Sequence, residues 1–196
     1  QRGYSVVLDS IEHDRTILTF KGSNNHLLQT DYDPKKLKTR WLYSSSMMQT
    51  SFVTLKKIMR EAKRQGGKIA FNPSSYQAKQ GIAALKGVLD QTDALILNLE
   101  EARQLAGKQG RAADLAVALA QHADDYVVIT DGPRGATLYH KHVIYHITPS
   151  KHLKVVETTG AGDAFASGFV AGLIKDYPIH HCLILGMVQA ESVIGA

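Results

Sequence analysis

The sequence predicts an α/β fold in which helices cover both faces of a mostly parallel β-sheet. Short apolar runs alternate with helical patterns between residues 41 and 130, a polar residue directly follows each run, and a hairpin pattern follows residue 135. Strands that alternate with helices form parallel sheets, because each right-handed crossover starts the next strand at the same edge. The 196 residues are enough for one sizeable core.

The N-terminal segment, ahead of this alternation, predicts a β-hairpin. Residues 5–8 and 15–20 have strand-like composition, and residues 9–14 connect them. Residues 21–34 follow as a polar stretch with turn-forming Gly, Asn and Pro residues. We therefore expect a small β region before the α/β core.

The alternating core contains the candidate parallel strands. Their apolar runs are residues 41–43, 68–71, 94–97 and 126–129. A helix is expected after the first run, because Phe52, Leu55 and Met59 recur at helical spacing. Further helices are expected through Leu85 and Leu89, from Glu100, and over residues 112–119.

The pattern changes after Gly135. Residues 136–140 and 143–147 predict an antiparallel hairpin, and Leu153–Val156 predicts one more strand. Two helices then close the chain, at roughly Ala161–Lys175 and Ile179–Ile194.

Polar residues close the parallel strands: Ser44, Asn72, Asn98 and Thr130. In open α/β sheets, ligands bind outside the carboxyl ends of the strands. Polar residues also end strands that have no such role, so a single position indicates little. Four in succession favour a ligand-binding crevice at this edge.

The composition is that of an ordinary globular protein, with 44% hydrophobic and 21% charged residues. The net charge of +5 does not indicate nucleic acid as a partner, because the densest basic run, residues 56–64, lies opposite an apolar helical stripe. That run is more simply the solvated face of a helix. No apolar stretch approaches the length of a membrane span, so we expect no membrane partner.

Cysteine and histidine give no sign of a metal centre. Cys182 is a lone cysteine, which indicates a reducing, cytoplasmic location and is interpreted as a core thiol. Four histidines surround the late hairpin, but their spacing is not typical of zinc ligands. They are His140, His142, His146 and His152.

The strongest local signal is the Gly-rich turn in residues 157–165, which leads from a predicted strand into a helix. Such a turn exposes unpaired N–H groups beside the positive end of the helix dipole, which suits phosphate oxygens. One carboxylate, Asp163, lies in the first turn of that helix. The simpler interpretation makes Asp163 a helix-stabilising acid. The paired threonines before it and the small residues behind it (Ala164, Gly168 and Gly172) favour a functional role.

Two other phosphate-binding patterns are absent from the sequence. It has no G-x-x-x-x-G-K-[ST], which excludes a P-loop NTPase, and no G-x-G-x-x-G after a strand, which argues against a nicotinamide-dependent dehydrogenase.

Residues 158–165, Thr-Thr-Gly-Ala-Gly-Asp-Ala-Phe, resemble the signature of the ribokinase (PfkB-type) family of carbohydrate and nucleoside kinases. Other segments resemble the family in the same order: residues 15–22 its lid strand, residues 98–102 its N-x-x-E-A motif, residues 127–136 its nucleotide-side strand and turn, and residues 190–196 its closing helix. The resemblance implies a ribokinase-like three-layer α/β/α fold with a mostly parallel sheet and a partial lid hairpin. It implies a remnant of the lid and acceptor-side β region in residues 1–33 and a nucleotide-binding α/β core, incomplete at both ends, in residues 34–196.

The resemblance also implies roles for individual residues. Asp163 would be the catalytic base, and the N–H groups of Gly160, Ala161 and Gly162 would stabilise the transferring phosphoryl group of ATP. Asn98 and Glu101 would position Mg²⁺ through its water shell. Without the resemblance, these two residues are better explained as a strand-end Asn and a solvated helix acid. The residues expected to contact the nucleotide are Thr130, Gly132, Gly135 and Gln189, the last in a position that is often Asn in the family.

The function that follows is ATP-dependent phosphorylation of a hydroxyl group on a sugar or related small molecule. The alternatives are a nucleoside (adenosine-like) kinase of the same family and a catalytically silent nucleotide-binding fragment, because the family's first strand and Gly-Gly motif have no counterpart here. Glu157 replaces the usual Asp before Thr-Thr, which leaves dependence on a monovalent cation open. The family further implies a homodimer through the lid sheet.

Overall fold

The structure is a computed structural model and describes residues 3–9, 15–152 and 155–195. The strands are β1 (Tyr4–Asp9), β2 (Arg15–Phe20), β3 (Trp41–Ser44), β4 (Lys68–Phe71), β5 (Ala94–Asn98), β6 (Tyr126–Thr130), β7 (Ala136–His140) and β8 (Val143–Ile147). The helices are α1 (Gln49–Arg64), α2 (Ser75–Ala78), α3 (Gly81–Leu89), α4 (Leu99–Ala106), α5 (Ala112–Leu119), α6 (Ala161–Ile174) and α7 (Ile179–Ile194).

The main sheet has the order β3-β4-β5-β6-β7-β8 within the described residues. Strands β3 to β6 run parallel, and β7 and β8 extend the sheet antiparallel. Asn98 pairs directly with Thr130, so the polar residues that close β5 and β6 are level at the edge of the sheet. The mostly parallel sheet predicted from the sequence is confirmed.

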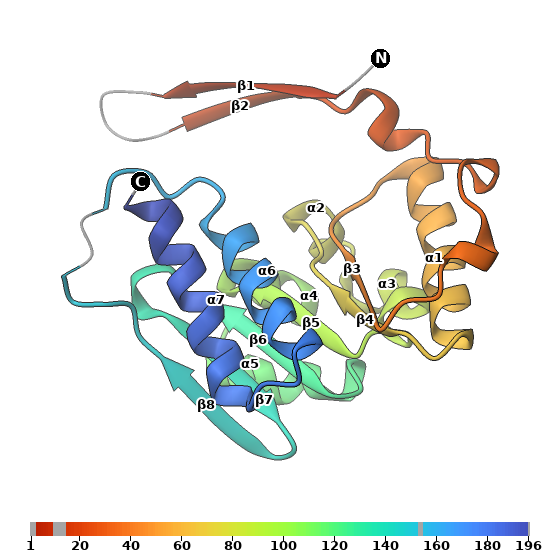
Figure 1. The fold of residues 1–196 in the computed structure, drawn as a ribbon. Helices are drawn as coiled ribbons and strands as arrows, with labels where there is room; N and C mark the ends of the chain where they lie inside the picture. The colour runs from red at the N-terminus through yellow and green to blue at the C-terminus, as the bar shows by residue number, and fades with distance from the viewer. Residues whose placement is uncertain (1–2, 10–14, 153–154, 196) are drawn as a thin grey trace.

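Helices cover both faces of the sheet (Figure 1). Strands β3 to β7 contribute side chains to the core on each face, whereas β8 contributes only to the core on the α6–α7 side. In β5, Leu95 and Leu97 pack with α1, α3, α4 and α5 on one face, whereas Ala94 and Ile96 pack with α6 and α7 on the other. Successive residues of a strand point to opposite faces, so a strand buried on both must be apolar throughout. Burial of each large apolar side chain stabilises this arrangement by about 2 kcal/mol.

Helices α6 and α7 pack against each other unusually closely because glycines lie between them. A Cβ on Gly168 would lie 2.7 Å from the Leu185 carbonyl oxygen, and one on Gly172 would lie 2.9 Å from Cys182 Cα. The small-residue stripe of the sequence is therefore the contact face of α6. It fixes α7 beside the first turn of α6.

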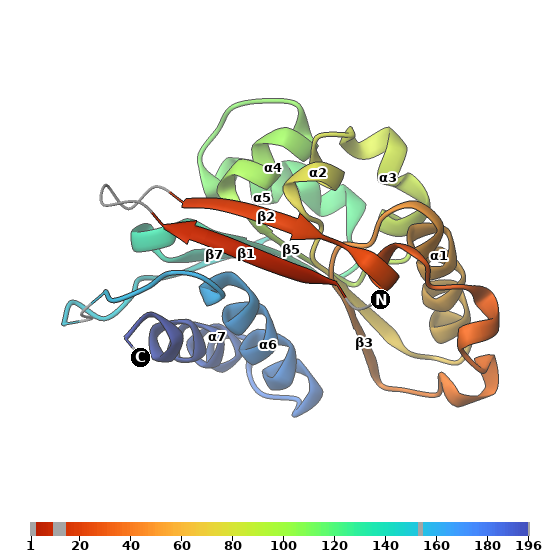
Figure 2. The same ribbon diagram turned by 90° about the horizontal axis from the view of Figure 1, so that it is seen from above.

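Strands β1 and β2 form a separate antiparallel hairpin with the register Tyr4–Phe20 to Asp9–Arg15. Viewed from above, the hairpin crosses between α2 and α4 on one side and α6 and α7 on the other (Figure 2). The segment after it is tied to α1, since the Leu27 N–H donates to Ser51 Oγ at 2.8 Å and Thr54 Oγ1 donates to the Leu27 carbonyl at 2.8 Å. The division at residues 33 and 34 remains a prediction.

The strand predicted for Leu153–Val156 is not found. Residues 153 and 154 lie outside the described residues, and Val155 and Val156 are not in a strand. The N–H groups of Val156 and Glu157 donate instead to the Ile194 carbonyl, at 2.9 and 3.3 Å. The backbone of this segment pairs with the end of α7, so it is not available to the sheet.

Two basic residues of the run on α1 form ion pairs with neighbouring carboxylates of this chain. Lys63 contacts Asp93 and Asp124, at 2.9 and 3.1 Å, and Arg64 contacts Glu61 at 2.6 Å. In the described part of the chain, none of the helices has the length and hydrophobicity that crossing a membrane requires.

Candidate active site

A cavity of about 250 Å³ lies where the parallel strands end and α6 begins. Among the strand-closing residues, Asn72, Asn98 and Thr130 line it. Ser44 does not; it is buried, and its hydroxyl donates to the Ser45 carbonyl at 3.1 Å. Three of the four polar residues that predicted a crevice therefore surround one.

The start of α6 forms one wall of this cavity through Gly160, Gly162 and Asp163. Gly160 has φ +84°, a left-handed conformation that glycine adopts without strain. The Ala161 N–H donates to the Thr158 carbonyl at 3.2 Å. Within the described residues no hydrogen bond is found for the N–H groups of Gly160, Gly162 and Asp163, so these three donors are available to bind an anion.

The side chain of Asp163 is exposed and lines the same cavity. Its carboxylate is not turned into the packed interior of the α6–α7 pair. A carboxylate and main-chain donors therefore share one small space at the carboxyl edge of the sheet.

Asn98 and Glu101 face this cavity from the start of α4, where they form a capping box. Asn98 Oδ1 accepts the Glu101 N–H at 2.8 Å, and Glu101 Oε2 accepts the Asn98 N–H at 3.0 Å. Glu101 Oε1 also accepts the Ser75 hydroxyl at 3.3 Å. Because both Glu101 oxygens are already hydrogen-bonded, a cation here is more simply held through water than by direct ligation.

Burial raises the pKa of Glu101, its hydrogen bonds lower it in part, and the charge of Asp163 raises it further. The two carboxylates therefore interact across the cavity. Repulsion between neighbouring carboxylates is relieved when a cation lies between them, which fits a divalent ion at this position.

A second cavity, of about 780 Å³, adjoins the first and has Thr130, Thr158 and Gly162 in common with it. Gly132 and Gly135 line it as well. Gly135 has φ +90°, and a Cβ there would lie 1.9 Å from the Ile147 carbonyl oxygen, so glycine is required. The nucleotide-contact residues predicted in the β6–β7 turn thus meet at one cavity.

Gln189, the remaining predicted nucleotide contact, does not line this cavity. It is exposed, and its Cγ packs against Gly168 of α6. The residues of α7 that do line the cavity are Met187, Ala190, Glu191 and Ile194. Their i, i+3, i+4, i+7 spacing places them on one face of the helix. This spacing can be read in the sequence, but it does not show what the face contacts.

Tyr43 is a further residue near the site that the sequence did not single out. Its ring packs with the core on the α6 side, and its hydroxyl oxygen is buried without a hydrogen-bond partner among the described residues. Burial and, to a lesser degree, the charge of Asp163 raise the pKa of Tyr43 to about 12. Tyr43 is therefore neutral and electrostatically coupled to the Asp163 carboxylate.

Glu157 folds back on its own loop. Its Oε1 accepts the N–H groups of Thr158 and Thr159 and the Thr159 hydroxyl, each at 2.7 Å. These bonds shape the turn that leads to Gly160.

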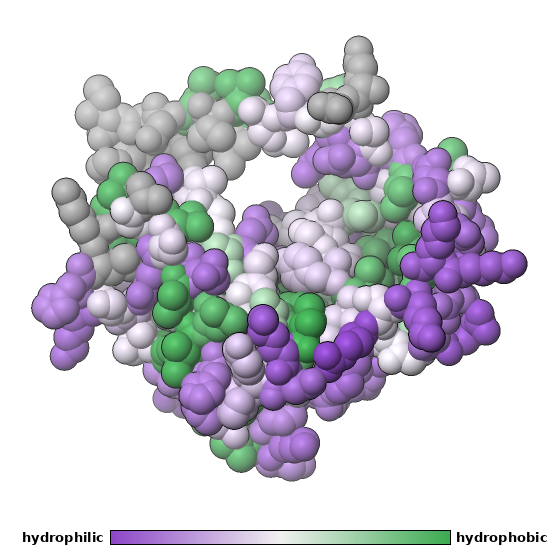
Figure 3. All heavy atoms as spheres, in the orientation of Figure 1, coloured by the Kyte–Doolittle hydropathy of each residue, from purple (hydrophilic) through white to green (hydrophobic). Residues whose placement is uncertain are grey.

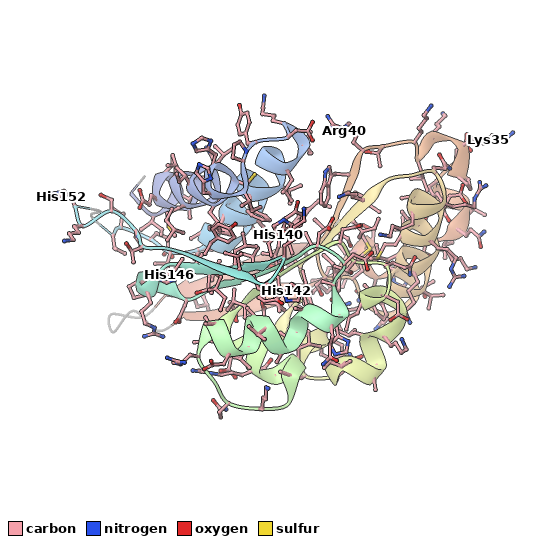
Figure 4. The ribbon with its side chains drawn as sticks, turned by 90° about the horizontal axis from the view of Figure 1, so that it is seen from below. Lys35, Arg40, His140, His142, His146 and His152 are labelled. Atoms are coloured by element: carbon pink, nitrogen blue, oxygen red, sulfur yellow. The ribbon has the colours of Figure 1, made fainter. Side chains whose placement is uncertain are left out.

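The histidines of the β7–β8 hairpin have separate partners. Nδ1 of His140 lies 2.8 Å from the Asp125 carbonyl, that of His142 lies 3.1 Å from the Tyr139 hydroxyl, and that of His146 lies 3.1 Å from Thr137 Oγ1. His152 lies well apart from His140 and His142 (Figure 4). Across the described ranges, no group of three or more His, Cys, Asp or Glu side chains that could hold a metal is found.

The fold is α/β, and the site places unpaired main-chain N–H groups at a helix start beside a carboxylate, a combination suited to an anion. The sequence matches the pfkB family carbohydrate kinases over residues 2–196, and the chain belongs to that family.

Relatives by sequence include a fructokinase of Klebsiella pneumoniae, 29% identical over 88% of this chain and 59% of the relative. A nucleoside kinase of Methanocaldococcus jannaschii is 28% identical over 65% of this chain and 41% of the relative. The chain thus spans well under two thirds of the length of these proteins.

Solved structures show the same fold. Adenosine kinase from Sinorhizobium meliloti has a TM-score of 0.87 at 20% identity, with 99% of this chain and 61% of that chain covered. Ribokinase from Thermotoga maritima has a TM-score of 0.81 at 20% identity, with 99% and 63% covered. The ribokinase-like three-layer fold expected from the sequence is confirmed.

Proposed function

We propose that this chain carries the ATP-binding and phosphoryl-transfer part of a kinase that phosphorylates a hydroxyl group of a sugar or related small molecule. The observation that carries the proposal is the small cavity in which Asp163, the N–H groups at the start of α6, and the Asn98–Glu101 capping box meet. Family membership supports it.

Asp163 is the proposed catalytic base. Its exposed carboxylate takes the proton of the acceptor hydroxyl as that oxygen attacks the γ-phosphorus of ATP. The N–H groups of Gly160, Gly162 and Asp163 stabilise charge on the transferring phosphoryl group. The Ala161 N–H contributes less than the family resemblance implied, because it donates within the turn.

The larger cavity is the proposed site of the nucleoside part of ATP, since it adjoins the smaller one and shares Thr130, Thr158 and Gly162 with it. Its predominantly apolar lining suits a purine ring. Asn98 and Glu101 would hold hydrated Mg²⁺, which when bound neutralises the phosphate charge.

Replacing Asp163 by Asn tests the base. We expect the variant, in the protein's longest natural form, to lose about 10²- to 10⁴-fold in turnover, because it cannot accept the proton. ATP affinity, measured by calorimetry, stays near that of the wild type. The matched control is Asp114→Asn, an acid in the first turn of α5 that lines neither cavity.

Turnover of Asp163→Asn within a few-fold of the wild type would show that another group is the base. An equal loss in Asp114→Asn would show that the effect is structural.

The acceptor is proposed to be a sugar, with a nucleoside as the second candidate. The fructokinase relative supports the first and the nucleoside and adenosine kinases support the second. A panel of sugars and nucleosides assayed with ATP and Mg²⁺ separates them. Because the chain spans about 59% of the fructokinase, we expect the 196 residues alone to bind ATP but to turn over weakly or not at all.

We also propose that two copies of the protein form a homodimer through the β1–β2 hairpin. One face of it presents the apolar residues Tyr4, Val6, Leu8, Leu18 and Phe20, each exposed by 45% or more. In Figure 3 the hairpin stands apart from the main body of the protein, with an opening between them. An apolar face of this kind marks an interaction surface.

A further inference from the structure

Tyr43 lies in the layer between the sheet and α6, just below the smaller cavity. It pairs with Ala70 of β4, and its ring packs on the core on the α6–α7 side, to which Ala70 belongs. The Asn72 N–H donates to the Ser44 carbonyl at 2.9 Å, which continues the pairing of β3 and β4 by one residue. Residues two apart in an extended chain share a face, so Asn72, which lines the cavity, follows Ala70 on the side of Tyr43.

Asp163 borders the same layer from α6. Ala166, three residues further along this helix, is buried in the core on the α6–α7 side. Residues three apart in a helix share a face, so Asp163 lies about one turn above the contact of α6 with that core. The electrostatic coupling agrees with this placement, because burial and, secondarily, the charge of Asp163 raise the pKa of Tyr43 to about 12.

Each of these two groups lacks a partner that the other can supply. The Tyr43 hydroxyl oxygen is buried, with no hydrogen-bond partner among the described residues. The Asp163 carboxylate is exposed, and it accepts no hydrogen bond from the part of the chain that the structure describes. A buried hydroxyl without a partner costs stability. A catalytic base, in turn, works best when a further group orients it.

We propose that Tyr43 is a positioning residue, whose hydroxyl donates a hydrogen bond to the Asp163 carboxylate when the substrates fill the cavity and so aims that carboxylate at the acceptor hydroxyl. The inference rests on the proposed function, in which Asp163 is the base. The contact forms by rotation of the exposed Asp163 side chain, since hydrogen bonds of a catalytic site often tighten only when substrate is bound. The proton of the acceptor passes to Asp163, and Tyr43 keeps its own proton.

A competing explanation is that Tyr43 only fills space in the core. The substitution Tyr43→Phe separates the two roles, because it keeps the ring and removes the hydroxyl alone. If the hydroxyl serves packing, turnover and stability should change together. If it positions the base, turnover should fall in a protein that is no less stable, which is the trade-off expected of a destabilising group that function requires.

The experiment measures the steady-state kinetics of the protein in its longest natural form, with ATP, Mg²⁺ and the sugar or nucleoside that it phosphorylates fastest. We expect Tyr43→Phe to lower kcat by about 10- to 100-fold, the range for one hydrogen bond to a charged group. Both KM values should stay within about twofold, and the midpoint of urea unfolding should not fall. The control Tyr145→Phe, a partly buried ring on the same core that lines neither cavity, should match the wild type in kcat.

A double-mutant cycle with Asp163→Asn tests whether Tyr43 acts through Asp163. Without the base its orientation no longer matters, so adding Tyr43→Phe to Asp163→Asn should lower kcat by less than about twofold. A further loss as large as that in the wild-type background would show that Tyr43 acts independently of Asp163, and it would overturn the inference.

An unchanged kcat in Tyr43→Phe, beside the expected loss in Asp163→Asn, overturns the inference and leaves the proposed function standing. A raised acceptor KM at unchanged kcat also overturns it, because Tyr43 would then bind the acceptor. A loss of kcat that comes with a lower urea midpoint does the same, since that pattern belongs to packing. If Asp163→Asn keeps its turnover, or the wild type phosphorylates no sugar or nucleoside, the proposed base fails together with this inference.

Discussion

At the scale of single residues, the site places two carboxylates in different surroundings at one cavity. Asp163 is exposed at a helix start, whereas Glu101 is 8% exposed and enclosed by hydrogen bonds to Asn98 and Ser75. Two separate sequence motifs identified these residues, the signature at residues 158–165 for Asp163 and the N-x-x-E-A motif for Glu101. Only the structure shows that Glu101 is buried, since nothing in a local pattern distinguishes a solvated helix acid from one covered by α2.

The raised pKa of Glu101 has a consequence for stability. A carboxyl that binds its proton more tightly in the folded state stabilises the fold at acid pH and loses that contribution as the pH rises through the raised pKa. Gln at this position carries no charge, and it can accept the Asn98 N–H and donate to Ser75.

We therefore expect Glu101→Gln to be at least as stable as the wild type at neutral pH. The difference should shrink as the pH falls toward the unfolded value of about 4.3. Urea unfolding at several pH values measures it. A variant clearly less stable than the wild type at neutral pH would contradict the direction of the pKa shift.

The buried Tyr43 hydroxyl leads to a second prediction at this scale. A buried polar atom without a partner destabilises the fold, so Tyr43→Phe should raise the free energy of unfolding by about 1 kcal/mol. Tyr139→Phe is the control and should lower it by about 0.5–1.5 kcal/mol, because the Tyr139 hydroxyl contacts His142 at 3.1 Å. Equal losses in both would mean that the Tyr43 hydroxyl has a water partner.

At the scale of elements, the contact between α6 and α7 sets the shape of the site. Gly168 lets α7 approach so closely that one face of it reaches the larger cavity and Gln189 faces α6. The sequence predicted both helices and the small-residue stripe. It did not predict which side of α7 meets the cavity, because the rotation of one helix against another depends on packing between distant residues.

Gly168→Ala tests this contact. Its Cβ would lie 2.7 Å from the backbone oxygen of Leu185, so we expect a loss of about 1–3 kcal/mol in unfolding free energy from overpacking. Gly87→Ala, in α3 with nothing within 4 Å of the added Cβ, should instead gain about 0.5–1 kcal/mol. Chemical denaturation of both variants compares them directly. Tolerance of Ala at 168 would mean that the two helices can separate without loss.

At the scale of the whole molecule, the β1–β2 hairpin carries five exposed apolar residues on one face, through which the dimer is proposed to form. Sedimentation equilibrium should show concentration-dependent dimers of the wild type. Leu18→Lys should shift them toward monomer, because Leu18 is 56% exposed on that face and a charge there resists burial. Val117→Lys on α5, at a residue 48% exposed outside the hairpin, should leave the association unchanged. Monomers in all three proteins would refute the proposed dimer.

The sequence by itself determined the alternation of strands and helices, the edge of the sheet where polar residues gather, and the helix start that carries Asp163. These features follow from periodicity and turn chemistry, which are local. The tertiary structure decided that Glu191 and not Gln189 lines the larger cavity, that Tyr43 lies in the field of Asp163, and that Val156 and Glu157 pair with the end of α7. Each of these depends on how close two distant segments come together, and that distance is set by packing across the whole core.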